Sequence, residues 1–255
     1  MLKRLVAAAV LSATIFVPAL SCRAADETPP LPHQQWSFDG IFGTYDRASA
    51  QRGFQVYKEV CSVCHAVKHL FFRDLADLGY SEDEIKAIAS TYEVTDGPND
   101  QGQMYQRPAR PSDPIPGPFP NDLAARAANN GALPPDLSMI VKAREGGPDY
   151  IFGLLNGYKD PPTGFNLLPG MNYNEYFAGH QIAMPPPLSD GAVTFADGTS
   201  ATVPQMAHDV VTFLAWAAEP NLEPRHRTGF KVMLFLVVAA GVFYAAKRKI
   251  WAVIH

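Results

Sequence analysis

Residues 61–65 read Cys-Ser-Val-Cys-His, directly after a stretch whose apolar residues follow a helical spacing. Two thiols separated by two residues can each form a thioether bond to a vinyl group of a haem. The adjacent histidine can then present a ring nitrogen to the iron. Cys61, Cys64 and His65 therefore predict one covalently attached haem c, with His65 as an axial iron ligand.

The same five residues have three other interpretations. A zinc site needs four nitrogen or sulfur ligands, but only these two cysteines remain once an N-terminal signal is removed. A thioredoxin-like redox pair usually begins a helix, whereas this pair follows one. A structural disulfide between Cys61 and Cys64 fits the spacing but leaves His65 unexplained. Haem attachment is the interpretation that uses all three side chains.

A second axial ligand must come from a distant part of the chain. Met184 precedes three successive prolines, which stiffen the backbone and would help to hold a weakly binding thioether on iron. Met184 is the predicted ligand, with Met171, His180 and simple packing of Met184 beside the haem as the alternatives. Met139 and Met206 lie on apolar faces of predicted helices, so core packing is their expected role.

The N-terminus carries an export pattern. Residues 1–24 combine a basic head, an apolar stretch and small residues near the end, which predicts a secretory signal peptide. A lipid anchor at Cys22 and a retained N-terminal helix are the alternatives. Export agrees with the haem prediction, because haem c is attached outside the cytoplasm.

The C-terminus carries an anchor pattern. Residues 228–246 form an apolar run with one lysine, and at about 1.5 Å per residue a helix of this length crosses a bilayer. A buried core helix is the alternative. The basic residues Lys247, Arg248 and Lys249 follow the run, which predicts that residues 247–255 form a cytoplasmic tail.

Residues 25–227 between these ends form the predicted exported haem domain, and its charge is strongly unbalanced. It holds all 25 acidic residues of the chain and 14 of the 21 basic ones, a net charge of −11. Such a surface repels nucleic acid and anionic lipid and attracts a basic partner.

The pattern of the domain is mostly helical. Ser81 and Glu84 form a capping-box signature, and many prolines mark a long loop over residues 97–120. Helices are expected over residues 46–60, 81–92, 122–129, 137–144, 149–157 and 204–218, and a small hairpin over 192–203. Long loops are uncommon unless they surround a functional object, which agrees with a haem.

Several stretches together resemble the cytochrome c1 family, and the resemblance covers nearly the whole chain. They are Arg-Gly-Phe-Gln-Val-Tyr at 52–57, the haem motif, residues 124–138, Gly-Gly-Pro-Asp-Tyr at 146–150, Asn-Tyr-Asn at 172–174, Met-Pro-Pro at 184–186, and the C-terminal anchor with its basic stop.

The resemblance implies a fold similar to class I c-type cytochromes, a mostly α haem domain with long loops plus one C-terminal transmembrane helix. In such a fold Gly53 lies at a close approach of two helices, opposite Phe213 and Trp216. The family pattern also assigns Arg144 to a haem propionate and Tyr150 to the wall of the haem pocket. The alternative for Arg144 is an ordinary charge at the C-terminus of a helix.

The resemblance also implies a function. Such a protein is the haem subunit of quinol–cytochrome c oxidoreductase, which takes electrons from a Rieske iron–sulfur protein and passes them to a soluble c-type cytochrome. Cytochrome b and the lipid bilayer are further implied partners. The expected location is a bacterial inner membrane, crossed once, with the haem domain in the periplasm and the C-terminus in the cytoplasm.

Other functions remain as alternatives. A stand-alone, membrane-tethered c-type cytochrome that feeds an oxidase would carry the same haem motif. A haem enzyme such as a peroxidase would need an open iron position, and a structural adaptor would need no haem. A histidine and methionine pair fills both axial positions and raises the redox potential relative to two histidines, which favours an electron carrier.

Overall fold

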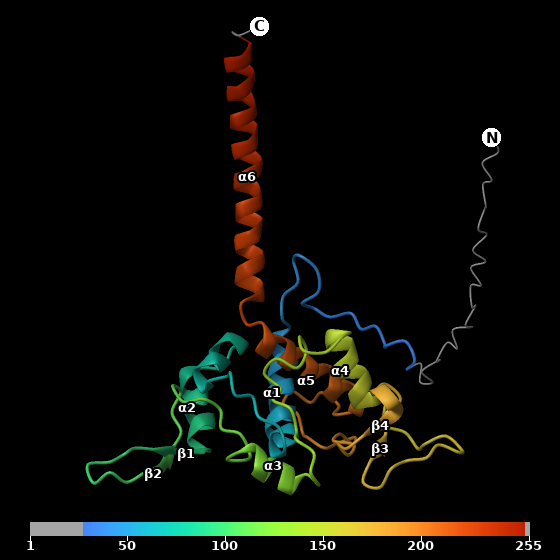
Figure 1. Ribbon diagram of the computed structural model, residues 1–255. Coiled ribbons are helices and arrows are strands. Elements are labelled where there is room, and N and C mark those ends of the chain that lie inside the picture. The colour runs from blue at the N-terminus through green and yellow to red at the C-terminus, as the bar shows by residue number, and fades with distance from the viewer. Residues whose placement is uncertain (1–27, 253–255) are drawn as a thin grey trace, which may run out of the picture.

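The computed structural model describes residues 28–252, so the predicted signal at residues 1–24 lies outside the described residues. The described chain is mostly helical with long irregular loops, as predicted (Figure 1). The helices are α1 (Arg47–Glu59), α2 (Glu82–Ser90), α3 (Asp122–Ala128), α4 (Gly147–Asn156), α5 (Val203–Ala218) and α6 (Leu222–Trp251). Two antiparallel strand pairs accompany them, β1 (Glu93–Asp96) with β2 (Tyr105–Pro108), and β3 (Asn172–Tyr173) with β4 (Gln181–Ile182).

The crossing of α1 and α5 forms the centre of the core. A Cβ added to Gly53 of α1 would lie 2.0 Å from the backbone oxygen of Asp209 and 2.8 Å from Cβ of Phe213. Only glycine allows the helices to come so close. The ring of Phe213 lies 5.7 Å from that of Tyr57 and 5.9 Å from that of Trp216. The close approach of Gly53 to Phe213 is therefore confirmed.

A buried ionic network joins the same two helices. The carboxylate of Asp209 is fully buried in α5 and accepts hydrogen bonds from Nε of Arg52 at 2.7 Å and from Oγ of Ser49 at 2.7 Å, both on α1. Gln205 donates a further bond at 3.1 Å. Arg52 also reaches Asp197 at 2.8 Å. Because the buried carboxylate has several donors, the cost of its desolvation is offset.

Most helices begin where their capping residues predict. The side chain of Asp46 accepts hydrogen bonds from the first turn of α1, and Ser81 and Glu84 form the predicted capping box of α2. The helix predicted over residues 137–144 is wrong, because that segment is a series of turns. The hairpin predicted over 192–203 is a loop, and the loop predicted over 97–120 contains β2.

The last helix stands apart from the domain. α6 leaves the body of the molecule, and Leu222 at its start is the residue that it buries there (Figure 1). It is long and apolar enough to cross a membrane, with a mean hydropathy of 2.0 over its apolar window, and none of that window is buried. A helix that exposes so much apolar surface is not a core helix of a soluble protein. This outcome favours the predicted anchor over its alternative.

The junction between α5 and α6 is clamped to the domain. The hydroxyl of Tyr45 donates to the carbonyl oxygens of Ala215 and Glu219 at 3.1 and 3.0 Å. Arg47 binds Glu223 of α6 at 2.9 Å. Lys142 binds the carboxylate of Glu219 at 2.6 Å. These contacts fix the direction in which α6 leaves the domain.

Candidate functional site

His65 is held in the form that binds a metal. Its Nδ1 lies 2.7 Å from the carbonyl oxygen of Pro135, which can only accept a hydrogen bond, so Nδ1 carries the proton. The other ring nitrogen, Nε2, then has a lone pair to offer. Burial lowers the pKa of His65 below its ordinary value, more than the bond to Pro135 raises it. The ring is therefore a neutral donor of fixed orientation.

The segment that contains Pro135 is fastened to the haem motif by further bonds. The backbone N–H of Leu137 donates to the carbonyl oxygen of Ala66 at 2.8 Å. The carboxylate of Asp136 accepts from the backbone N–H of Lys68 at 2.9 Å. Pro135 orients the ring of His65 directly, and Asp136 helps to fix the segment that carries Pro135, roles that the sequence analysis did not assign to them. The run of two prolines and an aspartate was the signal that could have indicated it.

The two cysteines of the motif lie in one tight turn. The backbone N–H groups of Cys64 and His65 donate to the carbonyl oxygen of Cys61 at 3.1 and 2.9 Å. Both cysteines are free thiols in the structure, so a structural disulfide is not supported. Burial raises the pKa of Cys61 to about 12. A thioredoxin-like pair needs a lowered thiol pKa, so this environment argues against a redox disulfide.

Met184 follows β4 at the far end of the second strand pair. Its carbonyl oxygen accepts a hydrogen bond from the hydroxyl of Tyr158 at 3.1 Å, and the side chain is half-buried. The strand before it is paired with β3, with Tyr173 opposite Gln181. The backbone of Met184 is thus held by β4, which ends two residues before it, by Tyr158 and by the prolines that follow. Such a fixed backbone would suit the predicted role of Met184 as a weakly binding iron ligand.

The alternatives to Met184 differ in their surroundings. The ring of His180 is buried and stacks on that of Tyr173 at a centroid distance of 5.6 Å, which gives it a packing role. Met206 is fully buried in α5, as predicted. Met139 is 41% exposed, so its predicted core role is wrong. The expected helix around it is absent, and its side chain lines an open cavity beside the end of α5.

Arg144 and Tyr150 lie near each other at the start of α4. Burial raises the pKa of Tyr150, and the positive charge of Arg144 opposes this shift. Arg144 is exposed, and its guanidinium donates to the neighbouring carbonyl oxygen of Ala143 at 3.2 Å. The alternative role as a helix C-terminal charge fails, because no helix precedes Arg144. The contacts described for these two residues do not reach His65 or Met184, so their haem roles stay predictions.

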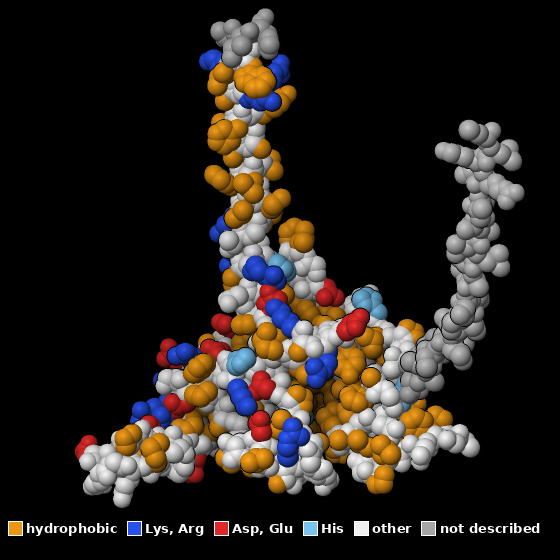
Figure 2. Space-filling view, in the orientation of Figure 1, with side chains coloured by type: hydrophobic (Ala, Val, Ile, Leu, Met, Phe, Trp, Pro, Cys, Tyr) orange, Lys and Arg blue, Asp and Glu red, His pale blue; other side chains and the backbone are white. Residues whose placement is uncertain are grey.

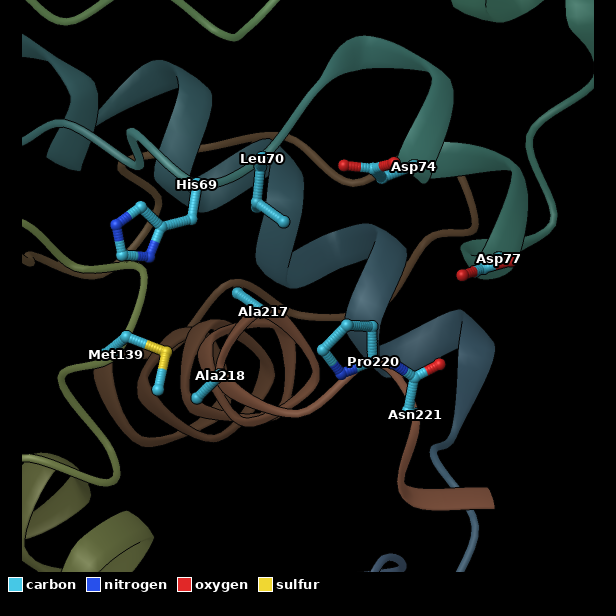
Figure 3. A pocket seen from close by; sticks show the side chains of 9 residues that line it. All are labelled: His69, Leu70, Asp74, Asp77, Met139, Ala217, Ala218, Pro220 and Asn221. Atoms are coloured by element: carbon cyan, nitrogen blue, oxygen red, sulfur yellow. The ribbon is translucent and has the colours of Figure 1, made fainter. Parts of the chain in front are cut away.

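An open cavity lies elsewhere in the domain. It measures about 420 Å³ and lies between residues 69–77, Met139 and the junction of α5 with α6. His69 and Met139 lie on one side of it and Asp74 and Asp77 on the other (Figure 3). Cys61, Cys64, His65 and Met184 do not line this cavity.

The donor set fits a haem iron. A neutral imidazole with a fixed ring lies directly after two thiols, and a thioether lies on a separately anchored loop. Residues 28–252 contain no cluster of three or more His, Cys, Asp or Glu side chains that could hold a metal ion.

A model of the Cytochrome C1 family matches residues 36–254, which is most of the chain. The chain belongs to the cytochrome c1 family. It is 50% identical over 239 residues to cytochrome c1 of Rhodospirillum rubrum, with 87% of each protein covered. It is 51% identical over 214 residues to the mitochondrial cytochrome c1 heme protein of Saccharomyces cerevisiae, covering 84% of this chain and 69% of that protein.

A third relative is longer than this chain. The protein named cytochrome b/c1 of Bradyrhizobium diazoefficiens is 47% identical over 271 residues, which cover 97% of this chain and 39% of that protein. The chain thus spans about two fifths of the length of that relative. As a member of the cytochrome c1 family, the chain carries a haem and serves respiratory electron transport. The predicted family and fold class are confirmed.

Proposed function

We propose that this cytochrome c1 is the haem subunit of a quinol–cytochrome c oxidoreductase, accepting electrons from a Rieske iron–sulfur protein and passing them to a soluble c-type cytochrome. The observation that carries the proposal is the fixed imidazole of His65, whose Nδ1 is held by Pro135 at 2.7 Å and whose Nε2 is left for iron. The family supports the haem, and this geometry supports His65 as its ligand.

Each predicted site residue has a part in this proposal. Cys61 and Cys64 would hold the haem through thioether bonds, and His65 and Met184 would bind its iron. When bound, the haem supplies a centre that gains and loses one electron. His65 and Met184 would be the two side chains that hold the iron, and with both bound no position would be left for an external ligand. Arg144 neutralises a propionate, and Tyr150 packs in the pocket wall.

The membrane arrangement follows from the anchor. We propose that residues 228–246 of α6 cross the bacterial inner membrane, with the haem domain in the periplasm and the basic end in the cytoplasm. Cytochrome b is the proposed neighbour in the bilayer. The name of the Bradyrhizobium relative, which joins a cytochrome b with a c1, supports this partner.

An optical and redox study of the membrane fraction tests the haem centre. We expect a c-type haem spectrum, haem that stays on the chain in denaturing gels, and no carbon monoxide binding to the reduced protein. A Cys61→Ser and Cys64→Ser double variant should lose the haem in the same gel. Haem that leaves the wild-type chain on denaturation would overturn covalent attachment, and carbon monoxide binding would overturn the proposed ligand pair.

Native gels test the partners. Cytochrome b and the Rieske protein should migrate with this chain in mild detergent. A chain that migrates alone, while it still donates electrons to an oxidase, would support the stand-alone carrier instead.

A further inference from the structure

A short loop before α1 carries an exposed apolar tip. Ile41 and Phe42 are each 75% exposed. The loop rises on the same side of the domain as α6, and hydrophobic side chains stand out there beside the base of α6 (Figures 1 and 2). Exposing two adjacent large apolar side chains to water is unfavourable. Such exposed groups mark contact sites.

The loop is a fixed structure. Its base is formed by the buried rings of Trp36, Phe38 and Tyr45. The backbone N–H of residue 44 donates to the carbonyl oxygen of residue 37 at 3.0 Å, and that of residue 43 donates to residue 40 at 3.3 Å. The tip therefore presents Ile41 and Phe42 in a set position beside α6.

A small cavity separates the tip from the base of α6. It measures about 190 Å³ and is lined by Ile41, Phe42, Gly43, Thr44, Glu223, His226 and Arg227. The Nδ1 atom of His226 is buried and has no hydrogen-bond partner among residues 28–252. A buried polar atom without a partner is costly unless a bound group satisfies it. This atom therefore indicates a polar group that the chain itself does not supply.

The charges around the cavity favour an anion. Glu223 is bound by Arg47 in a two-point ion pair at 2.9 and 3.0 Å, so its charge is compensated. Arg227 is exposed and forms no ion pair within the described part of the chain. The positive charge of Arg227 also acts on Glu223, whose pKa it helps to lower. Two arginines, Arg47 and Arg227, thus face one carboxylate beside the unsatisfied imidazole nitrogen, and the local charge is net positive.

The position of the cavity along α6 indicates the chemical source of that anion. The apolar run begins at residue 228, directly after Arg227, and none of its surface is covered by the domain. His226 and Arg227 lie within one helical turn of it, about 5.4 Å. The Ile41–Phe42 tip reaches the same level, because it lines the cavity with both residues. The tip thus continues the apolar surface of the anchor at the depth of lipid headgroups.

We propose that the Ile41–Phe42 loop and the first turns of α6 form a phospholipid site. The two apolar side chains enter the boundary between headgroups and acyl chains, and the headgroup phosphate accepts hydrogen bonds from His226 and Arg227. Amphipathic surface elements bind membranes through this combination of apolar insertion and basic contact. The site is independent of the haem and of the electron-transfer partners proposed above.

Photo-cross-linking distinguishes lipid from protein at the loop tip. A photoreactive benzoylphenylalanine replaces Phe42 in the full chain, in native membranes, and the matched control replaces Leu123, which is 79% exposed on α3 at the opposite end of the domain. Irradiation should add the mass of a phospholipid at Phe42 and none at Leu123. A polypeptide adduct at Phe42, equal lipid adducts at both positions, or no adduct at Phe42 would overturn the proposal.

A binding measurement tests the headgroup contact. The full chain in detergent is titrated with phosphatidylglycerol, and bound lipid is counted by native mass spectrometry. Arg227→Gln should weaken binding about fivefold, equivalent to about 1 kcal/mol for one basic residue at the surface. Arg110→Gln, an exposed arginine on the domain, is the charge-matched control and should have no effect. Equal effects of the two variants, or displacement of the lipid by the same concentration of inorganic phosphate, would contradict the site.

Discussion

Met184 is held through its backbone, so its side chain can be replaced without disturbing the conformation of its loop. Tyr158 binds the carbonyl oxygen of Met184, and this bond survives Met184→Leu. The variant should keep the covalent haem, lose the soft sulfur ligand and bind carbon monoxide when reduced. We expect its midpoint potential to fall by more than about 59 mV, a tenfold change in the one-electron equilibrium. A redox titration measures this, and a collapse in Met171→Leu with no change in Met184→Leu would identify Met171 as the ligand.

Gly53 leaves no room for a side chain. In Gly53→Ala the new Cβ would lie 2.0 Å from a backbone oxygen, so α1 and α5 must move apart. Overpacking of this kind costs about 1–3 kcal/mol of unfolding free energy. Denaturant unfolding of the full chain in detergent measures the loss. Gly229→Ala is the control, since a Cβ there meets no atom within 4 Å, and comparable stability of the two variants would refute the close approach.

Asp209 makes the stability of the domain depend on acid. Burial opposes its ionisation, but hydrogen bonds from His208, Arg52, Ser49 and Gln205 outweigh it and lower the pKa from 3.8 to about 2. A lowered pKa means that the stabilisation is complete above pH 4 and is lost as the pH falls toward 2, by about 2 kcal/mol. Asp209→Asn should be less stable than wild type at neutral pH and show a flatter decline over this range.

Acid unfolding curves of wild type and variant, followed by circular dichroism, check this expectation. The control is Asp83→Asn, whose carboxylate is 96% exposed on α2 and should contribute little. A wild-type and an Asp209→Asn protein with parallel curves between pH 4 and pH 2 would show that another carboxylate governs the transition.

The haem-attachment motif can be proposed from the sequence alone, whereas the role of Asp209 cannot. Cys61, Cys64 and His65 form a contiguous pattern whose chemistry needs no knowledge of distant contacts. Asp209 is a single carboxylate in an apolar helix, and its partners Arg52 and Ser49 lie on another helix about 160 residues away in sequence. Spacing within one helix cannot show which face of another helix it meets.

Among the secondary structure elements, the helix predicted over residues 137–144 does not form, and local hydrogen bonds tie the start of this segment to the haem motif. The backbone N–H of Ser138 donates to the side chain of Asp136, and the Ser138 hydroxyl accepts from the backbone N–H of His69. Leu137 donates to Ala66. The first N–H groups of a helix have no partner inside it, so these bonds do not by themselves exclude a helix, but they tie the start of the segment to the haem motif. The turns that follow are closed by separate bonds from Lys142 and Ala143 to Met139 and not by a continuous helical ladder. Ile140 and Val141 of this segment are buried although it forms no helix.

The anchor helix contributes little to the core of the domain. α6 buries Leu222, and its ion pair to Arg47 uses Glu223. A chain that ends after Arg227 keeps both residues and should be a soluble, folded domain that carries haem and exchanges electrons. Haem content and thermal unfolding of the purified fragment measure this. A fragment that cannot retain haem would show that the anchor belongs to the folded core.

A second truncation isolates the contribution of the clamp. A chain that ends after Asn221 loses Leu222 and Glu223 and leaves Arg47 without its partner. It should unfold at a lower temperature than the chain that ends after Arg227. Equal unfolding temperatures would mean that the clamp does not stabilise the domain.

At the scale of the whole molecule, the charge of −11 over residues 25–227 should steer a basic cytochrome. The candidate contacts are the acidic residues that follow the haem motif: Asp74, Asp77, Glu82, Asp83, Glu84, Glu93 and Asp96. Glu84 caps α2 and Asp96 is bound by Arg107, whereas Glu82 and Asp83 are more than 90% exposed and are the better candidates. The Debye length falls from about 10 Å at 0.1 M salt to about 3 Å at 1 M. The rate of electron transfer to the soluble cytochrome should therefore fall by roughly tenfold or more over that range.

Stopped-flow measurement of this reaction at increasing salt checks the steering. Transfer from the Rieske protein, which takes place inside the complex, is the internal comparison and should change much less. If the rate of electron transfer to the soluble cytochrome does not change with salt, the acceptor binds through an apolar surface or is tethered to the membrane.

The clamp at the junction of α5 and α6 also restricts how the domain can move. Tyr45, Arg47 and Lys142 hold the junction at several points, so the domain cannot move relative to α6 without breaking these bonds. The haem domain is therefore held at a fixed position relative to its anchor helix. Electron transfer is efficient only over short distances. Because this domain does not move relative to its anchor, the proposed donor and acceptor proteins must move toward it.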